Sequence, residues 1–179
     1  MKSVFLLLLI FSKVVQAQMG VPTFSEKCRG SKTVSPISGN PNHYSLGMQL
    51  DLAKMNSPAF KRTSCTFRMP VKLNEKQKLV ITNIEHDVQL SAGQGVESKS
   101  SLEIFLAGQK STPLQLQIKG IDSTQRVAKK LKTDGVVSES LCGQEIIVAG
   151  NLTASIAGSG KGTASTSPVL ITMEIVNCF

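Results

Sequence analysis

The sequence predicts an all-β protein: an antiparallel β-sandwich of about seven or eight strands, with at most one short helix and two disulfides. Three observations lead to this fold class. Apolar residues alternate with polar ones in repeated short runs, turn residues separate the runs, and four cysteines occur in a chain that begins like an exported protein. Alternation of period two marks a half-buried strand. A βαβ fold would need helical stretches between the strands, and these are nearly absent.

Length and composition agree with one globular domain. A chain of 179 residues falls in the size range of a single domain. Hydrophobic residues make up 41% of the chain, enough for a packed core, and charged residues only 18%. This composition excludes a disordered polyelectrolyte.

Residues 1–17 have the pattern of a secretory signal peptide. Lys2 precedes an unbroken apolar run from Val4 to Phe11, and small or apolar residues lead to Ala17. The run is much shorter than the roughly 20 residues that cross a bilayer. Cleavage after Ala17 leaves 162 residues with no further segment of spanning length. We therefore expect a secreted, extracellular protein that does not span a membrane, or a periplasmic one in a Gram-negative source.

The rest of the chain divides into two parts. Residues 18–42 are rich in Ser, Gly, Pro and Asn without a sustained period, and we expect an N-terminal arm or loop. Residues 43–179 form the predicted sandwich domain. Its alternating runs cover residues 44–52, 65–73, 80–90, 102–106, 114–118, 146–156 and 169–175. Turn-forming residues separate them at 91–95, 107–108, 134–135 and 158–160.

One segment, Ser123 to Lys132, also fits a helix. Val127 and Leu131 lie four residues apart, as on one helical face, and a Ser-Thr pair could cap the start. We predict a short helix or helical turn here. Read as a strand, the same segment would place Val127, Lys129 and Leu131 on one side.

The four cysteines are Cys28, Cys65, Cys142 and Cys178. In an oxidising compartment an even number of cysteines indicates a disulfide framework. No pair has the C-x-x-C or Cys/His spacing of a zinc or redox site. Two bridges allow three connectivities, which loop length does not separate. We favour sequential pairing, 28 with 65 and 142 with 178.

The chain is basic, with 20 Lys and Arg against 12 Asp and Glu, and loss of the signal peptide lowers the formal net charge from +8 to +6. The densest cluster contains Arg126, Lys129, Lys130 and Lys132. These residues could bind an anionic envelope or matrix polymer by counterion release, or simply form a solvated face. Specific nucleic-acid binding is not expected, because base stacking needs exposed aromatics and the Phe residues mostly fall on apolar faces. Stacking on sugar rings also needs exposed aromatic side chains, and the same lack of them counts against it.

Glu85-His86-Asp87 places a His between two carboxylates. In a strand Glu85 and Asp87 share one face, while His86 joins Val80 and Val88 on the other. The carboxylates therefore do not orient this imidazole as a catalytic triad would. Glu85 and Asp87 are weak candidates for a cation contact, but one pair supplies too few ligands. We expect no metal, no cofactor and no catalytic residues.

Gly158-Ser159-Gly160-Lys161-Gly162-Thr163 resembles a phosphate-binding loop only in part. Ser155 stands where the first Gly of that motif belongs, and a β-periodic run follows instead of a helix. We expect a hairpin loop.

Asn151-Leu152-Thr153 matches the N-glycosylation rule. The alternation directs Leu152 inward and Asn151 outward. Asn151 is therefore a candidate glycosylation site if the source is a eukaryote.

The segment from Arg62 to Leu73, with its basic-Ser-Cys step and Met-Pro-Val strand, resembles the opening of the secreted family catalogued as domain of unknown function 4360. The resemblance continues in Leu79–Ile84, Leu90–Gly93, Phe105–Gly108, Leu141–Gly143 and Cys178. The family usually has a Trp near each of the last two cysteines, where this chain has Leu141 and Val176-Asn177. The resemblance implies a small, secreted, β-rich protein and supplies no catalytic residues.

These observations together predict an exported, non-enzymatic binding or structural module of the envelope or extracellular space. The alternative is a secreted hydrolase or cation-dependent enzyme with a site built from loops, although no nucleophile elbow is present. Ligand, oligomeric state and source organism are left open by the sequence.

Overall fold

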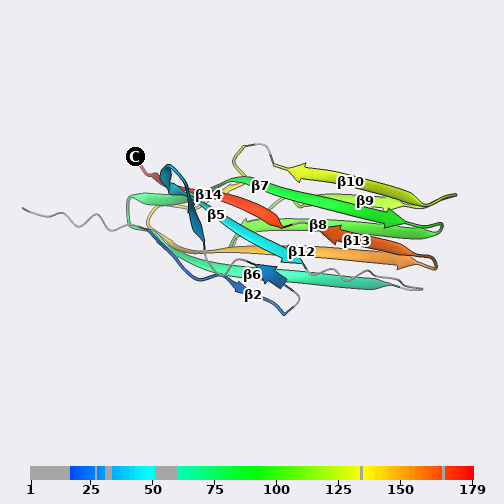
Figure 1. Cartoon of the computed structure of the whole chain (residues 1–179). Helices are drawn as coiled ribbons and strands as arrows, with labels where there is room; N and C mark the ends of the chain where they lie inside the picture. Colours follow the sequence, from blue (N-terminus) through cyan, green and yellow to red (C-terminus); the bar gives the residue numbers. More distant parts are fainter. Residues whose placement is uncertain (1–16, 27, 31–33, 51–59, 134, 167) are drawn as a thin grey trace, which may run out of the picture.

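The computed structural model describes residues 17–26, 28–30, 34–50, 60–133, 135–166 and 168–179. These residues form two antiparallel sheets packed face to face, with no helix among them (Figure 1). The predicted antiparallel β-sandwich is confirmed. The predicted signal peptide lies outside the described residues except for Ala17. Within the described ranges no helix is long and apolar enough to span a membrane.

The first sheet, here sheet A, has β12 at its centre. Its strands lie in the order β1 (Gln18–Met19), β6 (Lys61–Lys72), β12 (Glu145–Gly158), β8 (Val96–Leu106) and β9 (Leu114–Lys119), and β2 (Thr23–Phe24) also pairs with β6.

The second sheet, sheet B, is organised around the long strand β7. Its strands lie in the order β10 (Gln125–Lys132), β7 (Gln77–Ala92), β14 (Val169–Asn177), β5 (Asn40–Leu50) and β3 (Cys28–Gly30). β11 (Ser138–Glu139) and β13 (Gly162–Thr166) pair with β7, and β4 (Ser35–Ile37) pairs with β5.

Every alternating run of the sequence overlaps a strand of the sandwich. The structure has more strands than the sequence predicted. Most of the additional ones are short: β1 to β4 and β11 have only two or three residues each, and β13 has five. Strands this short show too little alternation to stand out in a sequence. Residues 18–42 contain four of them, which pair with β6 and β5 at the margins of the sandwich.

The predicted helix over residues 123–132 is wrong. Gln125–Lys132 is strand β10, paired with β7 from Gln125↔Ala92 to Lys132↔Glu85. A helix of about ten residues is marginal in water on its own, whereas an edge strand of a formed sheet supplies backbone partners along its whole length. In this strand Leu131 joins the core, and Lys129, two residues earlier, is exposed.

A β-bulge in β7 changes which side chains face the core. Thr172 of β14 pairs with Asn83 but Met173 pairs with Ile81, so Thr82 is an extra residue. The bulge shifts the inward phase by one residue. The expectation that His86 shares a face with Val80 is therefore wrong. Val80 precedes the bulge and His86 follows it, so their side chains point to opposite faces of the sheet.

The core fills the space between the two sheets. Side chains from both sheets are fully buried there, and the largest are Phe67, Leu46, Met69, Leu79, Ile81, Leu102, Ile104, Leu106, Leu152 and Ile156. Aliphatic residues dominate, so packing of this core depends on branched side chains more than on aromatic rings.

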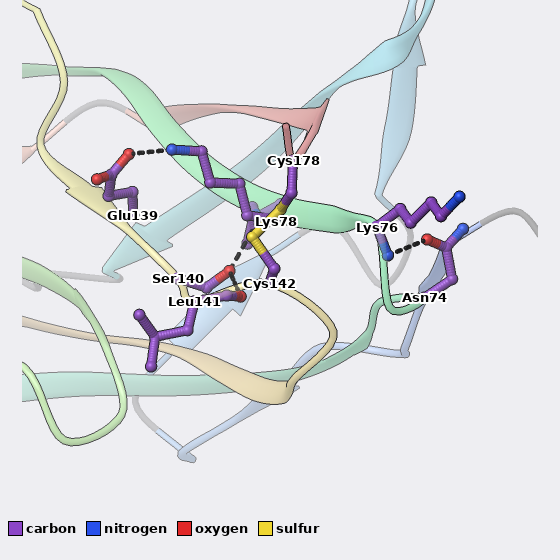
Figure 2. The surroundings of a disulfide bond; sticks show 9 residues. Asn74, Lys76, Lys78, Glu139, Ser140, Leu141, Cys142 and Cys178 are labelled. Atoms are coloured by element: carbon purple, nitrogen blue, oxygen red, sulfur yellow. Dashed lines mark hydrogen bonds and ion pairs between the residues drawn. A yellow bond between two sulfur atoms is a disulfide. The ribbon is translucent and has the colours of Figure 1, made fainter.

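Both disulfides form with the pairing that we favoured. Cys28–Cys65 joins β3 of sheet B to β6 of sheet A, and Cys142–Cys178 joins the turn before β12 to the chain end after β14. Figure 2 shows Cys142–Cys178 beside an ion pair in which Lys78 Nζ lies 2.8 Å from Glu139 Oε2. The first bridge ties the sheets together, and the second closes the C-terminus onto the sandwich.

Three turns meet at one end of the sandwich. Gly93 donates its N–H to the carbonyl of Lys161 at 2.8 Å, and Gly95 donates to the carbonyl of Gly120 at 2.8 Å. A Cβ on Gly120 would lie 2.1 Å from the carbonyl oxygen of Gly93. Glycine at position 120 is therefore what allows these turns to approach so closely.

Candidate functional site

The predicted basic cluster is divided between the two sides of β10. Alternation along this edge strand directs Arg126, Lys130 and Lys132 to the outer face of sheet B. Lys129 belongs to the other side, in phase with Leu131. The structure thus brings three of the four predicted cations onto one surface.

Part of this positive charge is neutralised by the neighbouring strand. Lys130 Nζ lies 2.6 Å from Glu85 Oε2. The hydrogen bond from Lys130 lowers the pKa of the Glu85 carboxyl, and the same contact raises the pKa of the Lys130 ammonium. Lys132 and Lys130 also stand opposite Glu85 and Asp87 in the strand pairing. Lys130 and Lys132 are therefore only partly available to an external anion.

Arg126 is placed differently. It forms one end of a row that crosses three strands, Arg126 of β10, Ser91 of β7 and Thr163 of β13. The hydroxyls of Ser91 and Thr163 lie 2.8 Å apart and share a hydrogen bond. This row runs along an open groove of about 470 Å³, which we call the Arg126 groove.

A second row completes the Arg126 groove with Ala128, Gln89 and Ser165. Ala128 adds only a small side chain to the lining, and Gln89 and Ser165 offer uncharged hydrogen-bonding groups. Within the described ranges, Arg126 makes no ion pair with a carboxylate. The arrangement suits an anionic group held by Arg126 with hydroxyls and an amide around it.

The outer face of sheet A has a groove of its own, of about 500 Å³. One row of it runs from Phe105 of β8 through Ala149 of β12 to Arg68 of β6. Ala149 forms a low floor, with the Phe105 ring on one wall and Arg68 on the other. We call it the Phe105 groove.

The next row of the Phe105 groove is polar. It runs from Glu103 through Asn151 to Thr66. The hydroxyl of Ser111 donates to Glu103 Oε1 at 3.3 Å. On the other side of the Phe105–Ala149–Arg68 row, the floor continues along β12 with Ile147, which is 40% exposed. Apolar surface and hydrogen-bonding groups therefore lie side by side.

Sequence reasoning missed Phe105. We expected the Phe residues to fall mostly on apolar faces, but Phe105 is half-buried on the outer face, one residue out of phase with Leu102, Ile104 and Leu106. The alternation of the sequence already indicates that Phe105 points outward. It does not indicate which side chains lie beside the ring, because these come from β6 and β12.

Asn151 points outward as predicted, and it lines the Phe105 groove. Its Oδ1 is buried and has no hydrogen-bond partner in the described part of the chain. Leu152 beside it is fully buried. A glycan on Asn151 would therefore occupy the Phe105 groove itself.

The run Glu85-His86-Asp87 does not form an acid–base site. The imidazole of His86 is 1% exposed and lies in the core, whereas Glu85 binds Lys130 on the outer face. Burial lowers the pKa of His86 to about 4. Among the described residues, no three His, Cys, Asp or Glu side chains are grouped so that they could hold a metal ion. Glu85, His86 and Asp87 therefore do not support the alternative of a secreted hydrolase or cation-dependent enzyme.

The Gly-rich segment 158–163 is a loop between β12 and β13, but not the hairpin that we expected, because these two strands lie in different sheets and do not pair with each other. It leads from sheet A to sheet B, and the carbonyl of Lys161 accepts the N–H of Gly93. No helix follows it in the described chain, so the geometry of a phosphate-binding loop is not formed.

The described residues thus define an antiparallel β-sandwich with two disulfides and an open groove on the outer face of each sheet.

Among solved structures, the chain is similar to TmCBM61 in complex with β-1,4-galactotriose, with 10% identity over 86% of this chain and 88% of that one and a TM-score of 0.26. It is also similar to the family 11 carbohydrate-binding module from Clostridium thermocellum, with 11% identity, coverage of 94% and 91%, and a TM-score of 0.22. A third is the C-terminal CBM6 of LamC from Zobellia galactanivorans, with 11% identity, coverage of 89% and 99%, and a TM-score of 0.24. Because these TM-scores are well below 0.5, what those proteins bind says nothing about the ligand of this chain.

No protein-family model matches the sequence. No curated protein matches it either.

Proposed function

We propose that this protein is an exported, non-enzymatic binding module that associates with an anionic polymer of the cell envelope or extracellular matrix. The observation that supports this most directly is the Arg126 groove, in which a guanidinium without a carboxylate partner in the described chain stands beside uncharged hydroxyl and amide groups. The proposal includes membership of the domain of unknown function 4360 family, on the resemblance given above.

Export is part of the same proposal. The two disulfides need an oxidising environment to form and persist. The signal-peptide pattern of residues 1–17 would bring the chain there. An envelope or matrix offers polymers with carboxylate or sulfate groups, which a basic protein attracts electrostatically.

Binding to polygalacturonate and to dextran sulfate tests the function, with neutral dextran as the reference polymer. We expect wild-type protein to bind the anionic polymers and to lose affinity steadily between about 50 and 500 mM NaCl, because counterion release drives the association. Arg126→Gln should weaken binding about fivefold, since one charge-assisted hydrogen-bonding contact is lost.

Arg62→Gln is the matched control for that variant. It removes the same charge from the outer face of sheet A, where Arg62 pairs opposite Ser155. If Arg62→Gln weakens binding as much as Arg126→Gln, only net charge matters and the groove is not the site. Association that does not respond to NaCl would rule out the electrostatic mechanism.

A further inference from the structure

The Phe105 groove has a composition that the proposed anion binding does not use. Its floor follows β12 through Ile147, Ala149 and Asn151, and its apolar part is the Phe105 ring with the aliphatic side chains beside it. At about 3.4 Å per residue, the floor from Ile147 to Asn151 extends about 14 Å. A ligand that follows this floor would be a chain of linked units and not a single small group.

The charges of the Phe105 groove balance. Arg68 of β6 on one wall and Glu103 of β8 on the other carry opposite charges, and strand β12 between them contributes the uncharged side chains of Ala149 and Asn151. An anionic ligand would meet the carboxylate of Glu103, and a cationic one the guanidinium of Arg68. Charge complementarity therefore favours a neutral ligand.

The polar groups of the groove suit hydroxyls. Glu103, Arg68 and Asn151 end in planar groups with at least two hydrogen-bonding atoms each, which match pairs of neighbouring hydroxyls on a ring. Asn151 Oδ1 also lacks a partner in the described chain. A rotation about the broad χ2 torsion of Asn151 would turn its amide toward a ligand hydroxyl.

A peptide strand fits this surface less well. β12 is paired on both sides, with β6 and with β8, so it offers no free backbone edge for strand addition. The ligand must be recognised by side chains on the face of the sheet. An aromatic face packs against the C–H side of a sugar ring, and the hydroxyls on the rim of that ring reach polar neighbours.

From these observations we propose that the Phe105 groove is a second binding site, on the sheet opposite the Arg126 groove, for two or more rings of a neutral saccharide chain. Phe105 stacks on one ring, and Glu103, Arg68 and Asn151 hydrogen-bond to hydroxyls. A protein with both grooves would hold a neutral saccharide on one face and an anionic polymer on the other.

Affinity electrophoresis through gels containing mixed-linkage β-glucan, galactan, xylan or mannan tests this site. The protein is produced in a host without N-glycosylation, so that Asn151 is free of glycan. We expect at least one of the four polysaccharides to retard the wild type, with the same retardation at low and high NaCl. Phe105→Ala should reduce the affinity about tenfold or more, and Phe105→Tyr should retain it.

Two further variants make the result decisive. Arg126→Gln should leave the retardation unchanged, which separates this site from the proposed anion site. If Phe105→Ala lowers the melting temperature, Glu103→Gln is used in its place, since this outer-face side chain is not part of the core. No retardation of the wild type in any of the four gels would overturn the proposal, as would equal retardation of the wild type and the variant used.

Discussion

His86 Nε2 lies 3.4 Å from Ser100 Oγ, in a contact that joins β7 of sheet B to β8 of sheet A inside the core. The other ring nitrogen, Nδ1, is buried with no partner among the described residues. The imidazole is therefore neutral in the folded protein at neutral pH, because burial disfavours its charged form.

The burial of the imidazole predicts that His86 makes the protein less stable in acid. The pKa of His86 is about 4 when folded, below its ordinary value of 6.5. As the pH falls below 6.5, the unfolded chain takes up the proton first, so the free energy of unfolding decreases until about pH 4 and then levels off for this group. The expected loss is about 3 kcal/mol.

Urea unfolding of the wild type and of His86→Gln at pH 7 and pH 4 measures this effect. The variant should lose about 3 kcal/mol less than the wild type between the two pH values. Carboxylates contribute equally to both proteins, so the difference belongs to His86. Parallel pH curves would show that this imidazole is accessible to protons in the folded state.

Gly120→Ala should destabilise the protein by about 3 kcal/mol. The new Cβ would lie 2.1 Å from the Gly93 carbonyl oxygen, which is backbone and has little room to move. The turns at residues 93–95 and 120 would have to separate. Thermal and urea unfolding measure the loss.

The control for this variant is Gly108→Ala. Gly108 has a φ of +87° but nothing within 4 Å of its Cβ position. Only backbone strain applies, and we expect a loss of about 1 kcal/mol. Equal losses for the two variants would mean that close approach of the turns does not determine the need for glycine at position 120.

Removal of the Cys142–Cys178 bridge by replacing both residues with Ser should lower the free energy of unfolding by roughly 3–4 kcal/mol. The two residues are separated by 36 positions, and the open loop gains conformational freedom in the unfolded state. Chemical denaturation of the double variant measures the change. The corresponding Cys28/Cys65 variant, with a separation of 37, should lose a similar amount. A double variant as stable as the wild type would contradict the prediction.

Glu85→Gln should strengthen binding to anionic polymers. The substitution removes the carboxylate that Lys130 contacts at 2.6 Å, so Lys130 becomes available on the same face of β10 as Arg126. Affinity for polygalacturonate at low salt measures the gain. Glu97→Gln makes the same change of net charge on sheet A, opposite Lys119. An equal gain in both variants would assign the effect to net charge alone.

Much of the sandwich could be predicted because a strand with one buried face shows its orientation locally. Leu102, Ile104 and Leu106 indicate the inward face of β8, and they leave Phe105 outside. The same local reasoning gave the wrong secondary structure for the segment 123–132. Val127 and Leu131 fit a helix by their own spacing, and only the partner strand β7 makes them part of a sheet.

The sequence by itself determined the fold class, most inward-facing residues, the exported character that we predict and the framework of four cysteines. These features depend on neighbours along the chain or on residue type. The tertiary structure decided the bulge at Thr82, the strand at 125–132 and the members of both grooves. Each groove row combines three strands that are distant in the chain, such as Arg126, Ser91 and Thr163. Alternation records only which way a side chain points, whereas the pairing of strands decides which side chains lie next to it.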